Sequence, residues 1–413
     1  MRPIARAVLI LFVFTIQWEY SLDLGEPLGN VARIVGLLLI LVAVPAVMHA
    51  GSLRTPGPLQ WATLAFFLGL CCSTFWSIDP SATLDKLRGF PQEMMIVWLA
   101  WELVDDPAGL RMLLRAYLAG SCVLALLTLA NLGSLDATIA GQTRLAAAGQ
   151  DPNDVARFLD LGFPVAALLI NGENRWPGRL LALGFLPLGL VAVLLTASRG
   201  GFLAGLVALA GCALLLFRSH ARAVLAGALA LPVVAVLLWV SIPHQVFERL
   251  GTIPEQIQSG DLNQRPNIWI AGGHAFLHAP IFGSGTGTFV QAAGLAPIDT
   301  AHNTILSIAV GGGLCAVFLV SLILALAIRS ILQIQGPLRM GMVLAFLVWG
   351  ITSLVATVEE SRTTWLLFAL AALAGRLAVE MPERLAAEFP SHQRKFASES
   401  SQADPDSVRI TAG

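Results

Sequence analysis

The segment NQRPNIWIAGGHAFLHAPIFGSGTGTF, residues 263–289, lies in the longest polar interruption of a chain that is otherwise mostly apolar segments. The interruption covers residues 243–313 and continues with DTAHNTILSIAVGGGL, residues 299–314. It contains Arg265, a glycine-rich turn, and His302 at the edge of the next apolar segment. We therefore predict a loop outside the membrane on a polytopic membrane protein, and we expect the functional site there.

The composition also indicates a membrane protein. The chain has 413 residues, of which 56% are hydrophobic and only 12% are charged. A soluble domain usually carries about 25% charged residues. The formal net charge is −1, so overall charge does not indicate nucleic acid as a partner. All five cysteines fall in apolar segments without metal-ligand spacing, and we interpret them as packing residues.

The predicted fold is all-α, a polytopic transmembrane bundle of about 12 helices with a large helical loop outside. Because about 20 apolar residues cross a bilayer as a helix, each long apolar segment is a candidate span. The signal is weakest in the first and fourth segments. No small-x-small cleavage site follows the first, so we expect a retained helix rather than a signal peptide. The segments are 5–19, 31–50, 58–76, 89–105, 110–131, 153–170, 177–197, 201–217, 222–241, 303–328, 338–357 and 362–379.

The distribution of lysine and arginine sets the predicted orientation. With both termini in the cytoplasm, most basic residues of the loops and tails fall on the inner side, as the positive-inside rule requires. The membrane domain is then residues 1–379, and its loop 242–302 lies outside. Residues 380–413 are rich in Ser, Glu and Gln, and we predict a disordered cytoplasmic tail.

The outer loop has helical segments of its own. Residues 265–279 place Ile268 and Ala275 near one face, so we predict an amphipathic helix at the membrane surface. Pro266 suits the first turn of a helix, and Pro280 ends it. The following FGSGTGTF, with Gly283, Gly285 and Gly287, is typical of a tight turn; because it follows no strand of a βαβ unit, it does not indicate a nucleotide site.

Two residues of the loop are candidates for chemistry. An imidazole such as His302 can act as a general base near neutral pH. Alternatively, His302 is an interfacial residue beside a helix that Asn303 or Thr304 caps. The guanidinium of Arg265 suits bidentate contact with phosphate, although a solvated loop arginine has the same sequence signature.

Three more arginines are predicted at the same side of the membrane. Arg199 lies in LLTASRGGFLAG, a short turn between two apolar segments, where it is either a snorkelling anchor or an anion ligand. Arg88, in DKLRGF with Lys86, and Arg157, in DPNDVARFLD, each suit an interface anchor when taken alone. Together with Arg265, these arginines could converge on one polyanion such as a diphosphate.

Other polar residues carry weaker signals. His274 and His278 have i, i+4 spacing, but no third ligand is evident on that face, so we predict no metal site. The sequence contains no outer Asp-x-Asp metal motif. For Glu359 and Glu360 we expect ion pairs with Arg362 in the last outer turn.

The order of these motifs resembles the O-antigen ligase and polymerase superfamily of bacterial envelope glycosyltransferases. The resemblance covers roughly residues 60–370, with a long outer loop in the family's position. Each motif alone is weak, whereas four in order are fairly specific. The matching pieces are DPND at the sixth apolar segment, SRGG in the short turn, RPNIWIAGGHAFLHAPIFGSGTGTF in the loop and HNTILSIAVGGGL entering the tenth segment.

The resemblance implies a chemistry and a place. Undecaprenyl diphosphate presents a glycan at the periplasmic face of the bacterial inner membrane, and the enzyme transfers the glycan to an acceptor hydroxyl. Ligases use lipid A–core oligosaccharide as the acceptor, and polymerases use another carrier-linked repeat unit. The family is similar to metal-independent, inverting glycosyltransferases, and no cofactor is expected. The family's histidine falls on His302 and its arginines on Arg199 and Arg265, while the match at Arg88 is looser.

Two rival interpretations remain. An O-antigen or exopolysaccharide polymerase needs the same carrier diphosphate and a hydroxyl acceptor. A transporter of lipid or solute would share the twelve-helix layout with both ends inside. We find no internal repeat, and the candidate charges gather at the outer face rather than at the bilayer midplane, which favours the enzyme.

Overall fold

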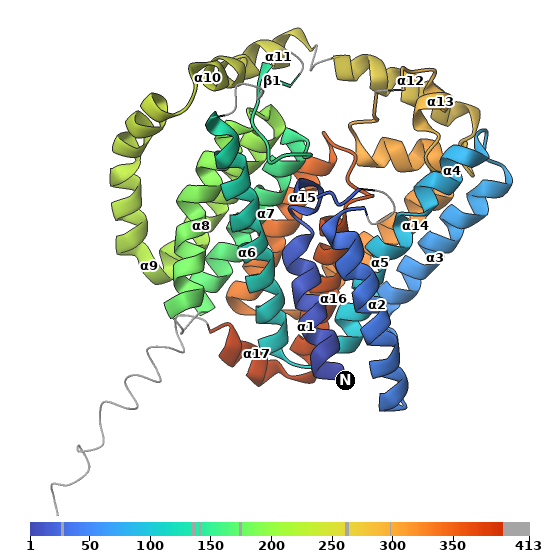
Figure 1. The fold of residues 1–413 in the computed structure, drawn as a ribbon, viewed down its shortest axis with the longest axis horizontal. Helices are drawn as coiled ribbons and strands as arrows, with labels where there is room; N and C mark the ends of the chain where they lie inside the picture. Colours follow the sequence, from blue (N-terminus) through green and yellow to red (C-terminus); the bar gives the residue numbers. More distant parts are fainter. Residues whose placement is uncertain are drawn as a thin grey trace, which may run out of the picture.

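The computed structural model describes residues 1–25, 29–133, 138–139, 142–172, 176–260, 264–297 and 299–390. These residues form an α-helical bundle, shown in Figure 1. Its only strands in the described ranges, β1 (Thr138–Ile139) and β2 (Gln142–Thr143), pair antiparallel. The 3-10 turns are η1 (Glu19–Ser21), η2 (Ser73–Phe75) and η3 (Asn131–Gly133). The α-helices are α1 (Arg2–Thr15), α2 (Val31–Ala50), α3 (Pro58–Cys72), α4 (Pro80–Leu87), α5 (Phe90–Leu103), α6 (Pro107–Ala130), α7 (Pro152–Gly172), α8 (Trp176–Leu195), α9 (Arg199–Ser241), α10 (His244–Gly251), α11 (Ile253–Ser259), α12 (Arg265–His278), α13 (Phe289–Ala293), α14 (Thr304–Gln333), α15 (Gly336–Ser353), α16 (Arg362–Glu380) and α17 (Pro382–Glu388).

The polytopic helical bundle predicted from the sequence is confirmed. By length and composition, nine helices in the described part of the chain can cross a membrane: α2, α3, α6, α7, α8, the first part of α9, α14, α15 and α16. A tenth candidate is the second part of α9, 219–241, which is bent by 49°. The other two predicted segments are α1 and α5, which are shorter, with 14 residues each. Both nevertheless pack into the bundle, where Phe12 and Ile96 are fully buried.

Helices α7 and α16 are the most enclosed of the spans. Their apolar stretches are 94% and 83% buried, whereas α2 and α8 bury 33% and 39%. Helix α7 packs against α6, α8, α9 and α15, and α16 packs against α5 and α14. Helices α7 and α16 are therefore the central helices of the bundle, and residues at their first turns lie in its interior.

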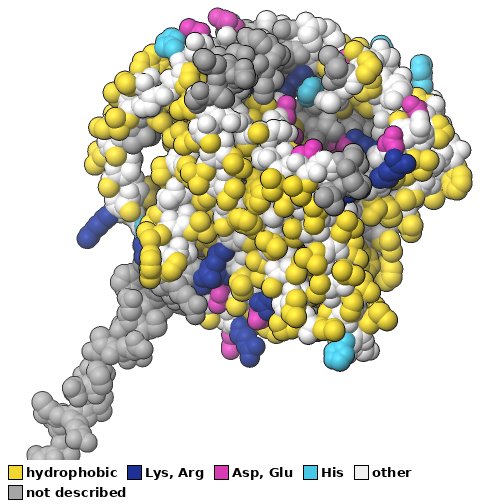
Figure 2. All heavy atoms as spheres, viewed as in Figure 1, with side chains coloured by type: hydrophobic (Ala, Val, Ile, Leu, Met, Phe, Trp, Pro, Cys, Tyr) yellow, Lys and Arg dark blue, Asp and Glu magenta, His cyan; other side chains and the backbone are white. Residues whose placement is uncertain are grey.

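The loop between α9 and α14 covers one end of the bundle, which we call the loop end. Helices α10, α11, α12 and α13 lie across it, opposite the N-terminus and α17 (Figure 1). In Figure 2, charged and histidine side chains surround a hollow at this end, while the flank below is largely hydrophobic. That division suits a protein whose flanks face lipid and whose loop end faces water.

The helix predicted at 265–279 is present as α12, with Pro266 in its first turn. Its apolar face differs from the prediction in what it contacts. Ile268 and Ala275 pack in a small cluster with Phe289 of α13 and Val310 of α14. The face is therefore buried within the protein instead of lying on the membrane surface, because α13 and α14 provide the apolar partner.

The predicted glycine-rich turn inserts into a break in α14. The backbone of Gly313 leaves the helical region, with φ 63° and ψ −164°. Across the break, the N–H of Gly285 donates to the carbonyl of Gly311 at 3.0 Å, and the N–H of Leu314 donates to the carbonyl of Pro280 at 2.8 Å. The three glycines of the turn all have positive φ, which glycine adopts without steric cost. This turn thus fixes α12 and α13 to the membrane bundle.

The ordered chain continues beyond the predicted start of the tail at residue 380. Helix α17 follows directly, and Leu385 and Phe389 are buried. Arg111 of α6 forms a salt bridge with Glu388 at 2.9 Å, which holds this segment against the bundle. The rest of the predicted tail, residues 391–413, lies outside the described residues.

Candidate active site at the loop end

Three backbone positions at the loop end are held in the left-handed region. They are Ala197, Gln264 and His302, with φ of 46°, 63° and 45°, and they are the non-glycine residues with positive φ among those described. Such conformations cost free energy and persist where the surroundings enforce them, often at functional sites. Each lies at, or within two residues of, a residue singled out from the sequence: Arg199, Arg265 or His302.

The turn between α8 and α9 fixes Arg199. Ser198 caps α9 by accepting the N–H of Gly201, which places Arg199 in the first turn. Nε of Arg199 donates to the carbonyl of Arg249 at 3.3 Å, and Nη2 donates to Oγ1 of Thr252 at 2.6 Å. In the opposite direction, Nε of Arg249 donates to the carbonyl of Ala197, in the turn before α9, at 3.0 Å. The two arginines therefore lock the turn to the end of α10.

Arg144 and Arg265 complete a group of arginines that we call the cationic cluster, with Arg199 and Arg249 as its other members. Nε of Arg144 donates to the carbonyl of Thr196 at 3.3 Å, within the same turn. Burial and then the charges of Arg144 and Arg199 lower the pKa of Arg249 to about 10. The same causes, in the same order, lower the pKa of Arg265. Mutual repulsion of this kind marks a region that an anion would stabilise.

His302 lies within range of the charge of Arg265. Burial first, and Arg265 second, lower the pKa of His302, while Asp151 and Asp299 act in the opposite direction. A lowered pKa favours the neutral imidazole, which is the form that can accept a proton. Asn303, rather than His302, caps α14, because its side chain accepts the N–H of Leu306 at 2.9 Å. This is the cap that the interpretation of His302 as an interfacial residue beside the helix also predicts, so capping does not distinguish the two interpretations of His302.

The other two predicted arginines lie elsewhere. Nη1 of Arg88 pairs with Asp85 at 2.6 Å, and the Arg88 side chain is 79% exposed. Arg157 is buried, pairs with Asp154 at 3.0 Å, and lies over the ring of Phe158. The structure therefore brings Arg199, Arg265 and His302 together, whereas Arg88 faces solvent and Arg157 faces a neighbouring cavity.

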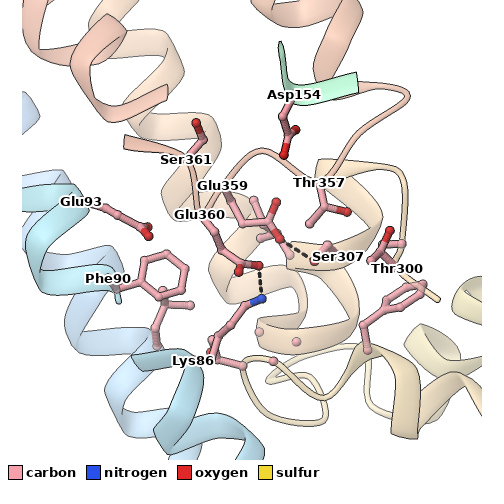
Figure 3. Close-up of a pocket in the computed structure, with 18 of the residues that line it drawn as sticks. Lys86, Phe90, Glu93, Asp154, Thr300, Ser307, Thr357, Glu359, Glu360 and Ser361 are labelled. Atoms are coloured by element: carbon pink, nitrogen blue, oxygen red, sulfur yellow. Dashed lines mark hydrogen bonds and ion pairs between the residues drawn. The ribbon is translucent and has the colours of Figure 1, made fainter. Parts of the chain in front are cut away.

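That cavity has a volume of about 420 Å³ and an unexpected charge. We call it the acidic cavity, because six carboxylates line it against only Lys86 and Arg157 (Figure 3). The aromatic residues Tyr20, Phe66, Phe90, Phe158 and Phe289 form part of its wall. The carboxylates are those of Glu19, Glu93, Asp154, Asp299, Glu359 and Glu360.

Ion pairs neutralise half of these carboxylates. Arg362 pairs with Glu19, Lys86 pairs with Glu360, and Arg157 pairs with Asp154. The ion pairs expected of Arg362 with Glu359 and Glu360 are therefore not the ones formed. Arg362 pairs with Glu19 of η1, which is distant in sequence, and Glu360 pairs with Lys86 of α4.

Glu359 is instead held by neutral groups. It is 7% exposed, its Oε1 accepts the hydroxyl of Ser307 at 2.5 Å, and its Oε2 has no hydrogen-bond partner in the described part of the chain. Its carbonyl accepts the indole N–H of Trp365 at 2.8 Å. Burial, followed by the charge of Glu360, raises the pKa of Glu359 to about 7. Figure 3 shows the side chain pointing into the cavity beside Glu360.

Two short segments join the cavity to the cationic cluster. Residues 299–301 line the cavity, and His302 follows directly. The DPND motif spans the same boundary: Asp151 acts electrostatically on Arg265 and His302, whereas Asp154 lines the cavity. His302 therefore lies between a positive region and a negative one.

Residues 182–321 match a family model described as O-antigen ligase. This match supports assignment of the chain to the O-antigen ligase and polymerase superfamily. No curated protein matches the sequence. Enzymes of this superfamily are glycosyltransferase-like. The matched segment contains Arg199, Arg249, Arg265 and His302, so most of the cationic cluster belongs to it.

Sequence reasoning missed three residues of these sites as candidates. Arg144 and Arg249 lie in loops on the predicted outer side, and that position was the signal that could have identified them as candidates. The sequence predicts ion pairs with Arg362 for both Glu359 and Glu360, and nothing local distinguishes the two acids. His274 and His278 are both exposed, and no group of three potential metal ligands occurs in the described ranges.

Proposed function

We propose that the protein is an O-antigen ligase. It transfers O-antigen polysaccharide from undecaprenyl diphosphate to a hydroxyl of lipid A–core oligosaccharide, and so completes lipopolysaccharide. The observation that carries this proposal is that His302 lies within electrostatic range of Arg265 and its arginine cluster, in the segment that matches the family model. The sequence motifs and the family match support the same chemistry.

The cationic cluster binds the diphosphate of the donor in this mechanism. Arg199 and Arg265 contact its oxygens, and their positive charge stabilises the leaving group as charge develops on it. Arg157 lies at the adjoining cavity, where it pairs with Asp154. Because a diphosphate paired with guanidinium groups leaves readily, the reaction needs no general acid.

His302 accepts the proton of the acceptor hydroxyl. The hydroxyl oxygen attacks the anomeric carbon from the face opposite the diphosphate and forms the new glycosidic bond. The bond to the diphosphate oxygen breaks, its electron pair leaves with undecaprenyl diphosphate, and the anomeric configuration inverts. The proton then passes from His302 to solvent, which restores the neutral imidazole.

The membrane arrangement follows from the same proposal. The protein lies in the bacterial inner membrane with its loop end in the periplasm and both termini in the cytoplasm. The membrane domain covers residues 1–379, the periplasmic loop covers 242–302, and the C-terminal segment 380–413, which includes α17, lies on the cytoplasmic side. The distribution of basic residues supports this orientation.

The first test uses purified protein in liposomes with carrier-linked glycan and lipid A–core. We expect a gel to show glycan moving to the core with wild type and not with His302→Ala. EDTA should leave the transfer unchanged, because arginines supply the charge that a metal would otherwise provide. Lengthening of glycan on the carrier without core would establish the polymerase instead. Movement of substrate across the membrane without transfer would establish the transporter.

A further inference from the structure

The acidic cavity differs in chemistry from a diphosphate site. No salt bridge joins Glu93, Asp299 or Glu359 to a cation within the described residues, so carboxylates exceed basic groups in its lining. Among its described residues, such a lining has no cation left to pair with phosphate, and it offers carboxyl oxygens as hydrogen-bond acceptors to hydroxyl groups. Aromatic walls, such as those at Tyr20 and Phe90, can pack against the apolar face of a sugar ring.

Glu359 is the carboxylate best placed to bind a hydroxyl. It is almost wholly buried, its side chain lines the cavity, and Oε2 has no protein partner in the described ranges. A buried polar atom without a partner costs free energy unless a ligand or water satisfies it. Ser307 and Trp365 fix the other atoms of the residue, so the orientation of Oε2 is set before anything binds.

The loop that carries Glu359 is tied to the segment that carries His302. The hydroxyl of Thr304 donates to the carbonyl of Ala356 at 2.8 Å and accepts the N–H of Val358 at 3.0 Å. The side-chain amide of Asn303 donates to the carbonyl of Leu354 at 3.2 Å. A sugar held at Glu359 is therefore bound by the same rigid unit that positions the histidine.

We propose that the acidic cavity binds the acceptor, as an uncharged, hydroxyl-rich sugar, and that Glu359 is its hydroxyl-binding residue. This inference rests on the proposed function and assigns the acceptor to a place distinct from the cationic cluster. The cavity volume of about 420 Å³ lies within the range of roughly 300–1,000 Å³ that small-molecule sites have. The donor glycan approaches His302 from the arginine side, and the acceptor hydroxyl approaches it from the carboxylate side.

The test measures the two ligands separately on the full chain in detergent. The acceptor probe is core oligosaccharide freed of lipid A and phosphate, and the donor probe is undecaprenyl diphosphate. We expect Glu359→Gln to weaken binding of the oligosaccharide about tenfold, because an amide nitrogen that only donates replaces one of the two carboxyl oxygens. Its dissociation constant for the diphosphate should stay within twofold of wild type. Glu255→Gln, the same change at an exposed position of α11, should alter neither.

Equal oligosaccharide binding by wild type and Glu359→Gln would overturn the inference, as would equal weakening of both ligands. If Glu359→Gln does not fold, Ser307→Ala keeps the carboxylate and frees its second oxygen; the inference then requires altered oligosaccharide affinity with unchanged diphosphate affinity. Failure of the proposed function has a different signature. In that case the protein transfers no glycan and does not bind undecaprenyl diphosphate, whatever the cavity binds.

Discussion

The cationic cluster and the acidic cavity lie side by side at the loop end, yet they are built in opposite ways. At the cluster, burial and then the charges of Arg144 and Arg199 lower the pKa values of Arg249 and Arg265, and Asp151 opposes this at Arg265. In the cavity, carboxylates outnumber cations, and both cations, Lys86 and Arg157, form ion pairs with acids of the lining. This difference is the basis for our proposal that the two regions bind ligands of different charge, with His302 between them.

The largest expected effect belongs to His302, which lies between the two regions. His302→Ala should lower the transfer rate on the order of 10²–10⁴-fold, because the general base is lost. Binding of undecaprenyl diphosphate and of core oligosaccharide should each stay within about twofold of wild type, since neither site is removed. Transfer kinetics in liposomes, with both affinities measured alongside, check this. Full activity of the variant would remove His302 from the mechanism.

The next effect is confined to the cationic cluster. Arg265→Gln should weaken binding of undecaprenyl diphosphate about 10- to 100-fold, the range expected for a lost charge-assisted contact. Arg265→Lys should rescue binding poorly if the contact is bidentate. Arg88→Gln is the matched control, because Arg88 is 79% exposed and paired with Asp85. Titration of the carrier lipid measures all three, and equal losses at Arg88 and Arg265 would contradict a localised site.

Much of this arrangement was predictable, because apolar length and charge placement are local properties of the sequence. The spans followed from hydrophobic segments, and α1 and α5, the weakest signals, are short helices. The position of a side chain around a helix was harder to predict. Lys86 and Arg88 are two residues apart, so they point in different directions, and only Lys86 reaches the cavity.

Glu359 could not be identified from its neighbours in sequence. Its hydrogen-bond partner, Ser307, is 52 residues away, and its burial depends on how the loop before α16 packs on α14. Arg362 lies three residues along but pairs with Glu19, 343 residues away. Charge pairing between distant segments therefore decided which acid stays without a cation.

A smaller effect is expected from a change in the shape of the cavity that leaves the cationic cluster intact. Gly287 lines the cavity with φ of 83°, and a Cβ there would lie 2.9 Å from Cβ of Lys86. We expect Gly287→Ala to weaken oligosaccharide binding several-fold by moving Lys86, while diphosphate binding is unchanged. Gly294→Ala is the control, because its φ of 64° carries similar strain but no atom lies within 4 Å of the added Cβ. Similar losses in both variants would mean that strain, rather than cavity shape, causes the effect.

The smallest expected effect is on the pH dependence of the transfer rate, which tests how Arg265 and Asp151 influence the pKa of His302. Only the neutral imidazole accepts a proton, so the rate at saturating substrates should fall as the pH drops through the pKa of His302. Arg265 lowers that pKa and Asp151 raises it. Arg265→Gln should therefore move the acid limb of the rate profile to higher pH, and Asp151→Asn should move it to lower pH. At a pH near the limb, each variant should change the relative rate by about a few-fold. A purely structural role for either residue would not shift the acid limb in opposite directions in the two variants. A shift in the same direction in both would show that His302 does not lie between the two charges.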